Sequence, residues 1–282
     1  MNPTVVAMRA GLARGWIELR QTFTNAQDIG GHLILTAILL TVMVFMRGKT
    51  VPGTDFSLSA MMLPSVLGAN VVFSGLTTTA MVLAIEREDG TLLRAKAVPN
   101  GMLGYLIGKI VSTIGVSLFS FGLVLVPGLF LFDGLALDLG SWLTLAWVLP
   151  LGLAATMPIG ATLGSLFKNP RNAGVVTPVF LGLIATSGIF YPITSLPQWV
   201  QGLAQGFPVY WMGLGMRSAM LPDELAAVEL GGSWRHLETV GVLGVWAAVG
   251  LVLAPVVLRR MARRESGSAV AARREKALQR VT

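Results

Sequence analysis

The stretch that decides the fold is residues 58–99, which read LSAMMLPSVLGANVVFSGLTTTAMVLAI followed directly by EREDGTLLRAKAVP. The first part, residues 58–85, contains no charged side chain, whereas residues 86–99 carry charges of both signs. A bilayer core about 30 Å thick is crossed by about 20 apolar helical residues. We therefore expect residues 58–85 to form a transmembrane helix and residues 86–99 to form a short loop at one membrane surface.

Apolar segments of similar length recur along the rest of the chain. The 282 residues are 54% hydrophobic and only 12% charged, with a mean hydropathy of +0.70, whereas soluble domains contain about 25% charged residues. This composition excludes an ordinary soluble enzyme and predicts an all-α integral membrane protein. Six transmembrane helices are expected, at residues 29–46, 58–85, 102–132, 142–167, 173–193 and 237–258.

The distribution of Lys and Arg predicts the orientation of these helices. All but four of the 21 basic residues fall on one side of the predicted membrane. Because basic loops stay in the cytoplasm, we expect both termini and the second and fourth loops to be cytoplasmic. The net charge of +7 then reflects topology and contact with anionic lipid, so no nucleic-acid partner is expected. The four basic residues on the outer side are Arg47, Lys49, Arg217 and Arg235.

The chain outside the transmembrane domain, residues 29–258, consists of two cytoplasmic segments. Residues 1–28 contain apolar side chains at spacings of three and four with charged residues between them, which predicts an amphipathic helix. A basic amphipathic helix of this length is expected to lie in the membrane interface. A soluble surface helix is the alternative. Residues 259–282 form a basic tail that is expected to be solvated or to contact lipid.

Polar residues recur on one face of the second predicted span. Asn70, Ser74 and Thr77 follow one another at spacings of four and three, so they share one side of a helix. Such a stripe faces protein or a water-filled path instead of lipid. Helix packing is one interpretation, and a substrate path that includes Phe73 is the other. In the third span, Gly104, Gly108 and Ser112 predict a close helix approach.

The segment before the last span is apolar and aromatic but is broken by Pro and Gly. Residues 187–211 are therefore expected to form short re-entrant or interfacial helices on the outer side, lining or capping a cavity. A candidate outer gate is formed by Phe190, Tyr191, Pro192 and Trp199. Anchoring of these aromatic side chains at the interface is an equally compatible interpretation.

Several chemistries have no residues to support them. The chain has no cysteine, and its two histidines, His32 and His236, are far apart, so neither a metal site nor a catalytic residue is expected. No Gly-x-x-x-x-Gly-Lys-Ser/Thr loop is present, so no cofactor, and in particular no ATP bound in that way, is expected on this chain. The predicted spans hold no cluster of ionisable residues for ion coupling. The energy source for any transport must lie on another chain.

The charged loop after the second span is expected to form a brief helix that ends at Pro99. Such a helix suits a groove on a cytoplasmic partner, and a solvated turn is the alternative reading.

The sequence resembles the permease subunit of type-2 ATP-binding-cassette exporters, in particular the bacterial drug and antibiotic exporter group. The resemblance rests on the N-terminal amphipathic helix, the run EREDGTL at residues 86–92, and the segment SGIFYP at residues 187–192 with PQW at 197–199. It implies a bacterial inner-membrane protein that forms a path with a second, identical or related, permease copy. It also implies partner ATPase subunits that bind ATP and magnesium. The residues that this resemblance places at the ATPase contact are Glu86, Arg87, Glu88, Gly90, Thr91 and Leu92.

The resemblance also suggests a class of substrate. Because the outer loops are short, a small amphipathic or lipid-like substrate is the first expectation, as in drug or antibiotic efflux. Export of a polysaccharide or glycolipid is the second. Outside transport, a lipid-modifying membrane enzyme and a non-transporting scaffold remain as alternatives.

Overall fold

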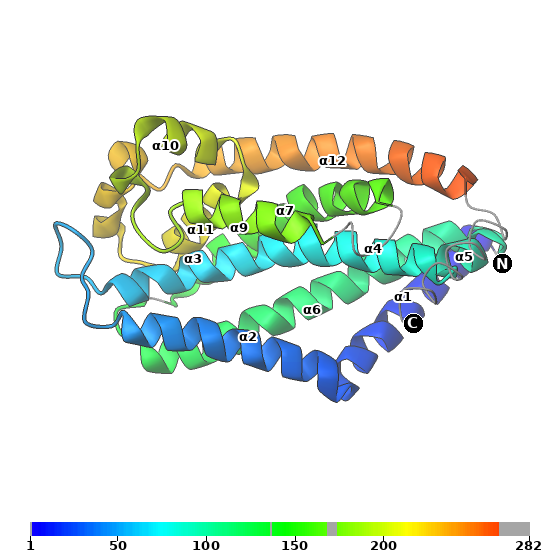
Figure 1. Ribbon diagram of the computed structural model, residues 1–282, viewed down its shortest axis with the longest axis horizontal. Coiled ribbons are helices and arrows are strands. Elements are labelled where there is room, and N and C mark those ends of the chain that lie inside the picture. The colour runs from blue at the N-terminus through cyan, green and yellow to red at the C-terminus, as the bar shows by residue number, and fades with distance from the viewer. Residues whose placement is uncertain (1, 136, 168–173, 265–282) are drawn as a thin grey trace, which may run out of the picture.

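The computed structural model describes residues 2–135, 137–167 and 174–264, and these residues form a helical bundle (Figure 1). No strand occurs among the described residues, which contain one isolated bridge between Thr50 and Ser57. Short 3₁₀ turns lie at Ile193–Ser195, Asp223–Val228 and Leu230–Gly232. The longer elements are α1 Pro3–Thr24, α2 Ala26–Phe45, α3 Leu58–Phe73, the π-helix η1 Ser74–Thr78, α4 Thr79–Glu88, α5 Thr91–Lys96, α6 Gly101–Leu131, α7 Leu139–Leu166, α9 Val176–Thr186, α10 Gln198–Gln205, α11 Pro208–Met220 and α12 His236–Arg264.

Five helical segments are long and apolar enough to cross a membrane. They are Ala26–Phe45, Leu58–Glu88, Gly101–Leu131, Leu139–Leu166 and His236–Met261, and each coincides with a predicted span within a few residues. The fifth predicted span contains α9, which has 11 residues and so a length of about 16 Å at 1.5 Å per residue. That length is below a full crossing. The described residues thus contain five candidate spans, and the sixth stays a prediction.

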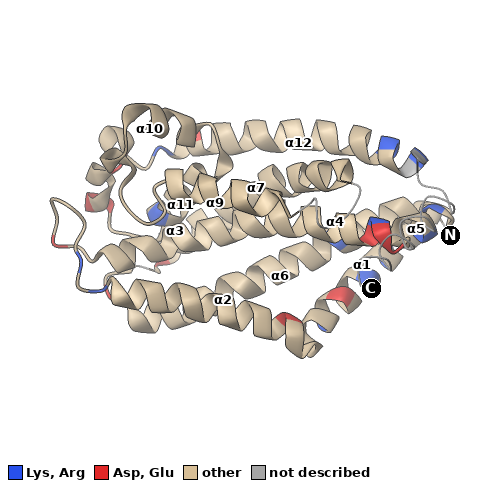
Figure 2. Cartoon of the chain, viewed as in Figure 1, with Lys and Arg blue, Asp and Glu red and all other residues tan. Residues whose placement is uncertain are grey.

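The charges gather where a bundle that crosses a membrane would place them. Figure 2 shows most Lys, Arg, Asp and Glu at the two ends of the bundle and on α1, with the helix middles largely free of them. The beginning of α1, the loop helix α5 and the end of α12 lie at one end (Figure 1). The basic residues of the fourth loop, Lys168 and Arg171, and the tail from residue 265 lie outside the described residues.

The centre of the bundle is built around α11. This helix is almost entirely buried and packs against α3, α7 and α12. Its approach to α3 is close, because a Cβ at Gly68 would lie 2.8 Å from the carbonyl carbon of Met212. The segment predicted to form short re-entrant or interfacial helices, residues 187–211, contains α10 and only the first turn of α11. Its re-entrant or interfacial placement stays a prediction. In contrast to α11, α10 is amphipathic and partly exposed.

Small residues bring α1 against α6. Ala7, Gly11 and Gly15 are buried along one side of α1, and a Cβ at Gly11 would lie 2.6 Å from the carbonyl oxygen of Gly104. The predicted close approach at Gly104 and Gly108 is therefore confirmed, with α1 as the approaching helix. The large apolar side chains of α1, among them Leu12 at 53% and Trp16 at 65% exposure, point away from the bundle. That arrangement suits a helix that lies in a membrane surface.

Candidate functional site

The charged loop turns back on itself at Gly90. This residue follows the end of α4 with φ of 81°, a left-handed conformation that glycine adopts without a steric penalty. Beyond the turn, the backbone N–H of Thr91 donates to Asp89 Oδ1 at 2.8 Å, and Arg94 Nη2 donates to Thr91 Oγ1 at 2.8 Å. These local bonds start α5 immediately after α4. The brief helix that the sequence predicted is present.

One side of α5 is attached to the bundle and the other is exposed. Leu92 is 2% exposed and lies in an apolar cluster that includes Leu83 on α4 and Leu258 on α12. Arg94 and Lys96 are exposed, and Val98 is 60% exposed. Leu92 therefore holds the loop helix to its own chain, and the basic residues and Val98 form the face that a partner could reach.

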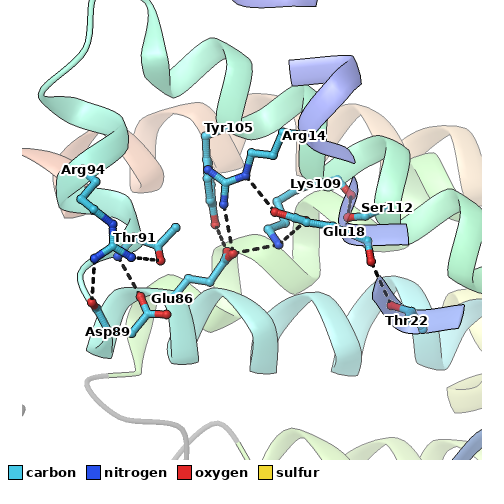
Figure 3. A network of polar contacts seen from close by, with 10 residues as sticks. All are labelled: Arg14, Glu18, Thr22, Glu86, Asp89, Thr91, Arg94, Tyr105, Lys109 and Ser112. Atoms are coloured by element: carbon cyan, nitrogen blue, oxygen red, sulfur yellow. Dashed lines mark hydrogen bonds and ion pairs between the residues drawn. The ribbon is translucent and has the colours of Figure 1, made fainter. Parts of the chain in front are cut away.

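Below the loop, α1, α4 and α6 are joined by a charge network, which we define as Arg14, Glu18, Glu86, Tyr105 and Lys109 (Figure 3). Lys109 Nζ lies 2.7 Å from Glu18 Oε2 and 2.8 Å from Glu86 Oε1. Arg14 pairs with the same two carboxylates, at 2.8 Å and 3.4 Å. The hydroxyl of Tyr105 donates to Glu86 Oε2 at 2.6 Å. Two cations thus balance two carboxylates across three helices.

The charge network changes the ionisation of Glu18. Partial burial alone would raise the pKa of this carboxyl, because burial disfavours the charged form. The hydrogen bonds and positive charges of Lys109 and Arg14 outweigh burial, so the pKa of Glu18 lies below its ordinary value of 4.5. Glu18 is therefore a carboxylate at neutral pH, and it draws α1 toward α6.

The loop residues expected at an ATPase also make contacts within the chain. The side chain of Glu86 is 12% exposed and belongs to the charge network. Arg87 Nη1 donates to the carbonyl oxygens of Ser165 and Phe167, both at 3.0 Å, and so binds the free carbonyl end of α7. Glu88 and Thr91 are half-buried. Contact of these residues with an ATPase stays a prediction.

A cavity of ≈ 740 Å³ adjoins the charge network. It lies between α1, α2, α6 and the continuous segment α3–η1–α4, and Glu18, Glu86 and Lys109 form part of its wall. Asn70 and Ser74 line it further along the second span.

The structure thus brings three of the four predicted path residues to one cavity. Phe73 lines the wall beside Asn70 and Ser74. Thr77 does not line it, and its buried hydroxyl has no hydrogen-bond partner among the described residues. A role for any of them in transport stays a prediction.

The π-helix η1 is the point where the second span changes its register beside the cavity. Residues Ser74–Thr78 form this single π turn, a feature that occurs often at functional sites. Gly75 and Gly160 allow η1 and α7 to approach each other closely. The contact leaves no space for a side chain on either glycine. The Ser74 hydroxyl, in a residue that is 6% exposed, has no partner among the described residues.

The candidate outer gate is only partly assembled. The Tyr191 hydroxyl donates to the carbonyl oxygen of Ala185, and Pro192 is buried at the start of a 3₁₀ turn. Phe190 packs against the main core as a partly buried side chain. Trp199 is 73% exposed and lies apart from that core. Its position suits interfacial anchoring, and a gating role stays a prediction.

A buried ion pair near the outer end was not predicted from the sequence. Arg217 on α11 and Glu229 are each 1% exposed at the side chain, and two bonds of 2.6 Å and 3.1 Å join them. Arg217 Nη1 also donates to Ser65 Oγ on α3 at 2.8 Å. Arg217 had been counted only as an outer basic residue. An arginine inside an apolar helix was the available signal, because such a charge requires a buried partner.

The apolar helices, the polar cavity and the charge network define a class of protein, the multi-pass membrane protein with a polar cavity between its helices. The family follows from comparison with known sequences: residues 24–255 match the family model of the ABC-2 family transporter proteins. That match covers most of the chain, so the chain belongs to this family and is a transporter membrane subunit, which is not an enzyme by itself. A search of curated proteins found no match.

Proposed function

We propose that this chain is the membrane subunit of an ATP-binding-cassette exporter and forms the path for a small amphipathic or lipid-like substrate, as in drug or antibiotic efflux. The observation that supports this proposal is the cavity beside η1, which meets the charge network at one end and apolar residues such as Phe73 and Val116 elsewhere. A volume of ≈ 740 Å³ lies within the range of about 300–1,000 Å³ that is typical of small-molecule sites.

The loop around α5 is the proposed contact with the separate ATPase subunit. A force on its exposed face would reach α4 through the turn at Gly90 and through Leu92, which is embedded in the bundle. From α4, Glu86 connects to α1 and α6, and Arg87 connects to α7. Closure of two ATPases on ATP and magnesium would then move several helices around the cavity together.

The proposed assembly contains a second permease copy and lies in a bacterial inner membrane, with both termini in the cytoplasm. The basic residues at the end of the bundle that carries α5 support this orientation through the positive-inside rule. Exposed apolar side chains on α2, such as Ile34 and Phe45, are available to lipid or to the second copy.

Export of a glycolipid or polysaccharide is the second candidate. Amide and hydroxyl groups on the cavity wall favour it, since sugars bind through such groups; they include Gln21, Gln27, Asn70 and Thr113. Among the described residues of the wall, Phe73 is the one Phe, Trp or Tyr side chain, and an extended sugar track would be expected to present more.

Copurification tests the proposed function. The chain is purified from its native membrane, partners are identified by mass spectrometry, and ATPase activity is measured for wild type, Lys96→Glu and Lys49→Glu. Both lysines are exposed, but Lys96 lies on the loop helix and Lys49 lies between α2 and α3 at the opposite end.

We expect an ATP-binding-cassette subunit to copurify with wild type and with Lys49→Glu, and to be lost or uncoupled with Lys96→Glu. Absence of any ATPase from the wild-type preparation, under conditions that preserve known complexes, would contradict the proposal. Retention and normal coupling with Lys96→Glu would show that the contact does not depend on this face of the loop, and loss with both variants would show that the effect is not specific to it.

A further inference from the structure

The cavity contains a carboxylate, Asp28, that no Lys or Arg of the described residues neutralises. The two carboxylates of the charge network are balanced by its two cations. Asp28, on the first turn of α2, also lines the cavity and is exposed. Its described contact is the side-chain amide of Asn25, which donates to Asp28 Oδ2 at 3.0 Å, and no described Lys or Arg pairs with it. Among the described residues, the cavity and the charge network together therefore carry one more carboxylate than cations.

Neutral polar groups on the wall are also unengaged. The side-chain amides of Gln21, Gln27 and Asn70 make no hydrogen bond within the described part of the chain. Ser74 is 6% exposed, and its buried hydroxyl lacks a partner in the same part of the chain. Gln21 and Gln27 are exposed, whereas a buried hydroxyl such as that of Ser74 is normally hydrogen-bonded. These groups therefore offer acceptors and donors to a bound headgroup.

The remaining wall is apolar and adjoins the exposed face of α2. Leu35, Phe73, Val82 and Val116 contribute apolar surface to the cavity. The Phe73 ring can in addition attract a cation through its π face. An apolar part of a ligand could thus lie in the cavity while its polar head stays near Asp28.

We infer that the cavity binds amphiphiles that carry a single protonated amine, with the ammonium group paired to Asp28 and hydrogen-bonded to the amide side chains. This inference rests on the proposed function, because it names the class of substrate that the exporter carries. The charge decides against an anionic headgroup: Lys109 already contacts two carboxylates, so an anion would compete with both of them. A neutral sugar head would leave Asp28 without a cation.

Direct binding to the purified full chain tests the inference without any ATPase. The protein is placed in phosphatidylcholine nanodiscs, and saturable binding of tritiated dodecylammonium is measured above that of empty nanodiscs. Unlabelled dodecanoate and dodecyl maltoside, which share the alkyl chain, serve as anionic and neutral sugar competitors. The variants are Asp28→Asn and Asn70→Leu, with Asp55→Asn as a control for loss of an exposed carboxylate in the loop at the other end.

We expect wild type and Asp55→Asn to bind dodecylammonium equally, and Asp28→Asn to bind it at least tenfold more weakly. Asn70→Leu should bind it several-fold more weakly, and neither competitor should displace it. Thermal unfolding checks that each variant is folded.

Three results would overturn the inference. Binding that is unchanged in Asp28→Asn, even with lower thermal stability, would assign Asp28 to the helix terminus alone. Displacement by dodecyl maltoside would favour a sugar head, and displacement by dodecanoate would favour an anion. Because no ATPase is present, these results leave the proposed function standing, whereas failure of ATPase copurification removes that function without changing the binding result.

Discussion

At the scale of single residues, the chain depends on charges that are paired inside it. The side chains of Arg217 and Glu229 are almost fully buried, and Arg217 also donates a hydrogen bond to Ser65. The guanidinium of Arg217 therefore links α11 to α3 and to the outer loop that carries Glu229. Removal of one partner of a buried pair leaves the other charge without compensation, whereas apolar replacement of both is far less costly.

We expect Arg217→Met to destabilise the protein by about 3–5 kcal/mol, because Glu229 would remain buried and unpaired. The double variant Arg217→Met, Glu229→Leu should recover most of this loss. Thermal unfolding of the detergent-purified protein measures both. Equal loss in the single and double variants would mean that the pair does not dominate the stability of this region.

The pH dependence of stability reports on Glu18. Its pKa is lowered in the folded chain, so the stabilisation is fully present above the ordinary value of 4.5 and is lost as the pH falls through the lowered pKa. The variant Glu18→Gln should therefore be less stable than wild type at neutral pH, and the difference should shrink below pH 4.5.

Unfolding midpoints measured from neutral pH into this acidic range check that expectation. Glu224→Gln, at an exposed site in the outer 3₁₀ turn, is the control and should follow wild type throughout. A constant difference between Glu18→Gln and wild type at every pH would exclude an ionic contribution from Glu18.

At the scale of elements, close helix contacts at glycines position the site. The docking of α1 on α6 at Gly11 and Gly15 places Arg14 beside Glu86 of α4 and Glu18 beside Lys109 of α6. The crossing of α7 over η1 at Gly160 bounds the π turn beside the cavity. Backbone proximity of this kind depends on the absence of a side chain.

Gly15→Ala should destabilise the protein although Ala favours a helix by about 1 kcal/mol relative to Gly. Its Cβ would lie 2.7 Å from the carbonyl oxygen of Gly108, which belongs to the backbone and cannot move aside easily. Gly30→Ala on α2 meets nothing within 4 Å and should be neutral or stabilising. Thermal unfolding of the two variants distinguishes packing from propensity, and an unchanged Gly15→Ala would show that α1 is loosely docked.

At the scale of the whole molecule, the two ends of the bundle have different proposed environments. The chain has no cysteine, so single cysteines can report sidedness without a background. We expect Lys49→Cys to react with a membrane-impermeant maleimide on intact cells. Lys96→Cys should react only after permeabilisation, because the α5 end is proposed to be cytoplasmic. The reverse pattern would invert the topology.

Much of the architecture could be predicted from the sequence because helix formation in a membrane is local. Each backbone group of a span is satisfied within four residues, so a long apolar run is enough to indicate a helix. Five predicted spans are present for this reason. The fifth span was harder to predict, because its helix α9 has only 11 residues and lies within a segment broken by glycine and proline.

The sequence by itself determined the membrane class, the charge bias of the ends and the polar stripe on the second span, since these follow from composition and from spacing along one helix. Only the tertiary structure decided which charges meet. Glu86 and Arg14 are 72 positions apart, and Arg217 and Ser65 are 152 apart. The cavity beside η1 likewise exists only where four segments converge. Such contacts depend on how helices pack, and no local pattern encodes the distance between two side chains on different helices.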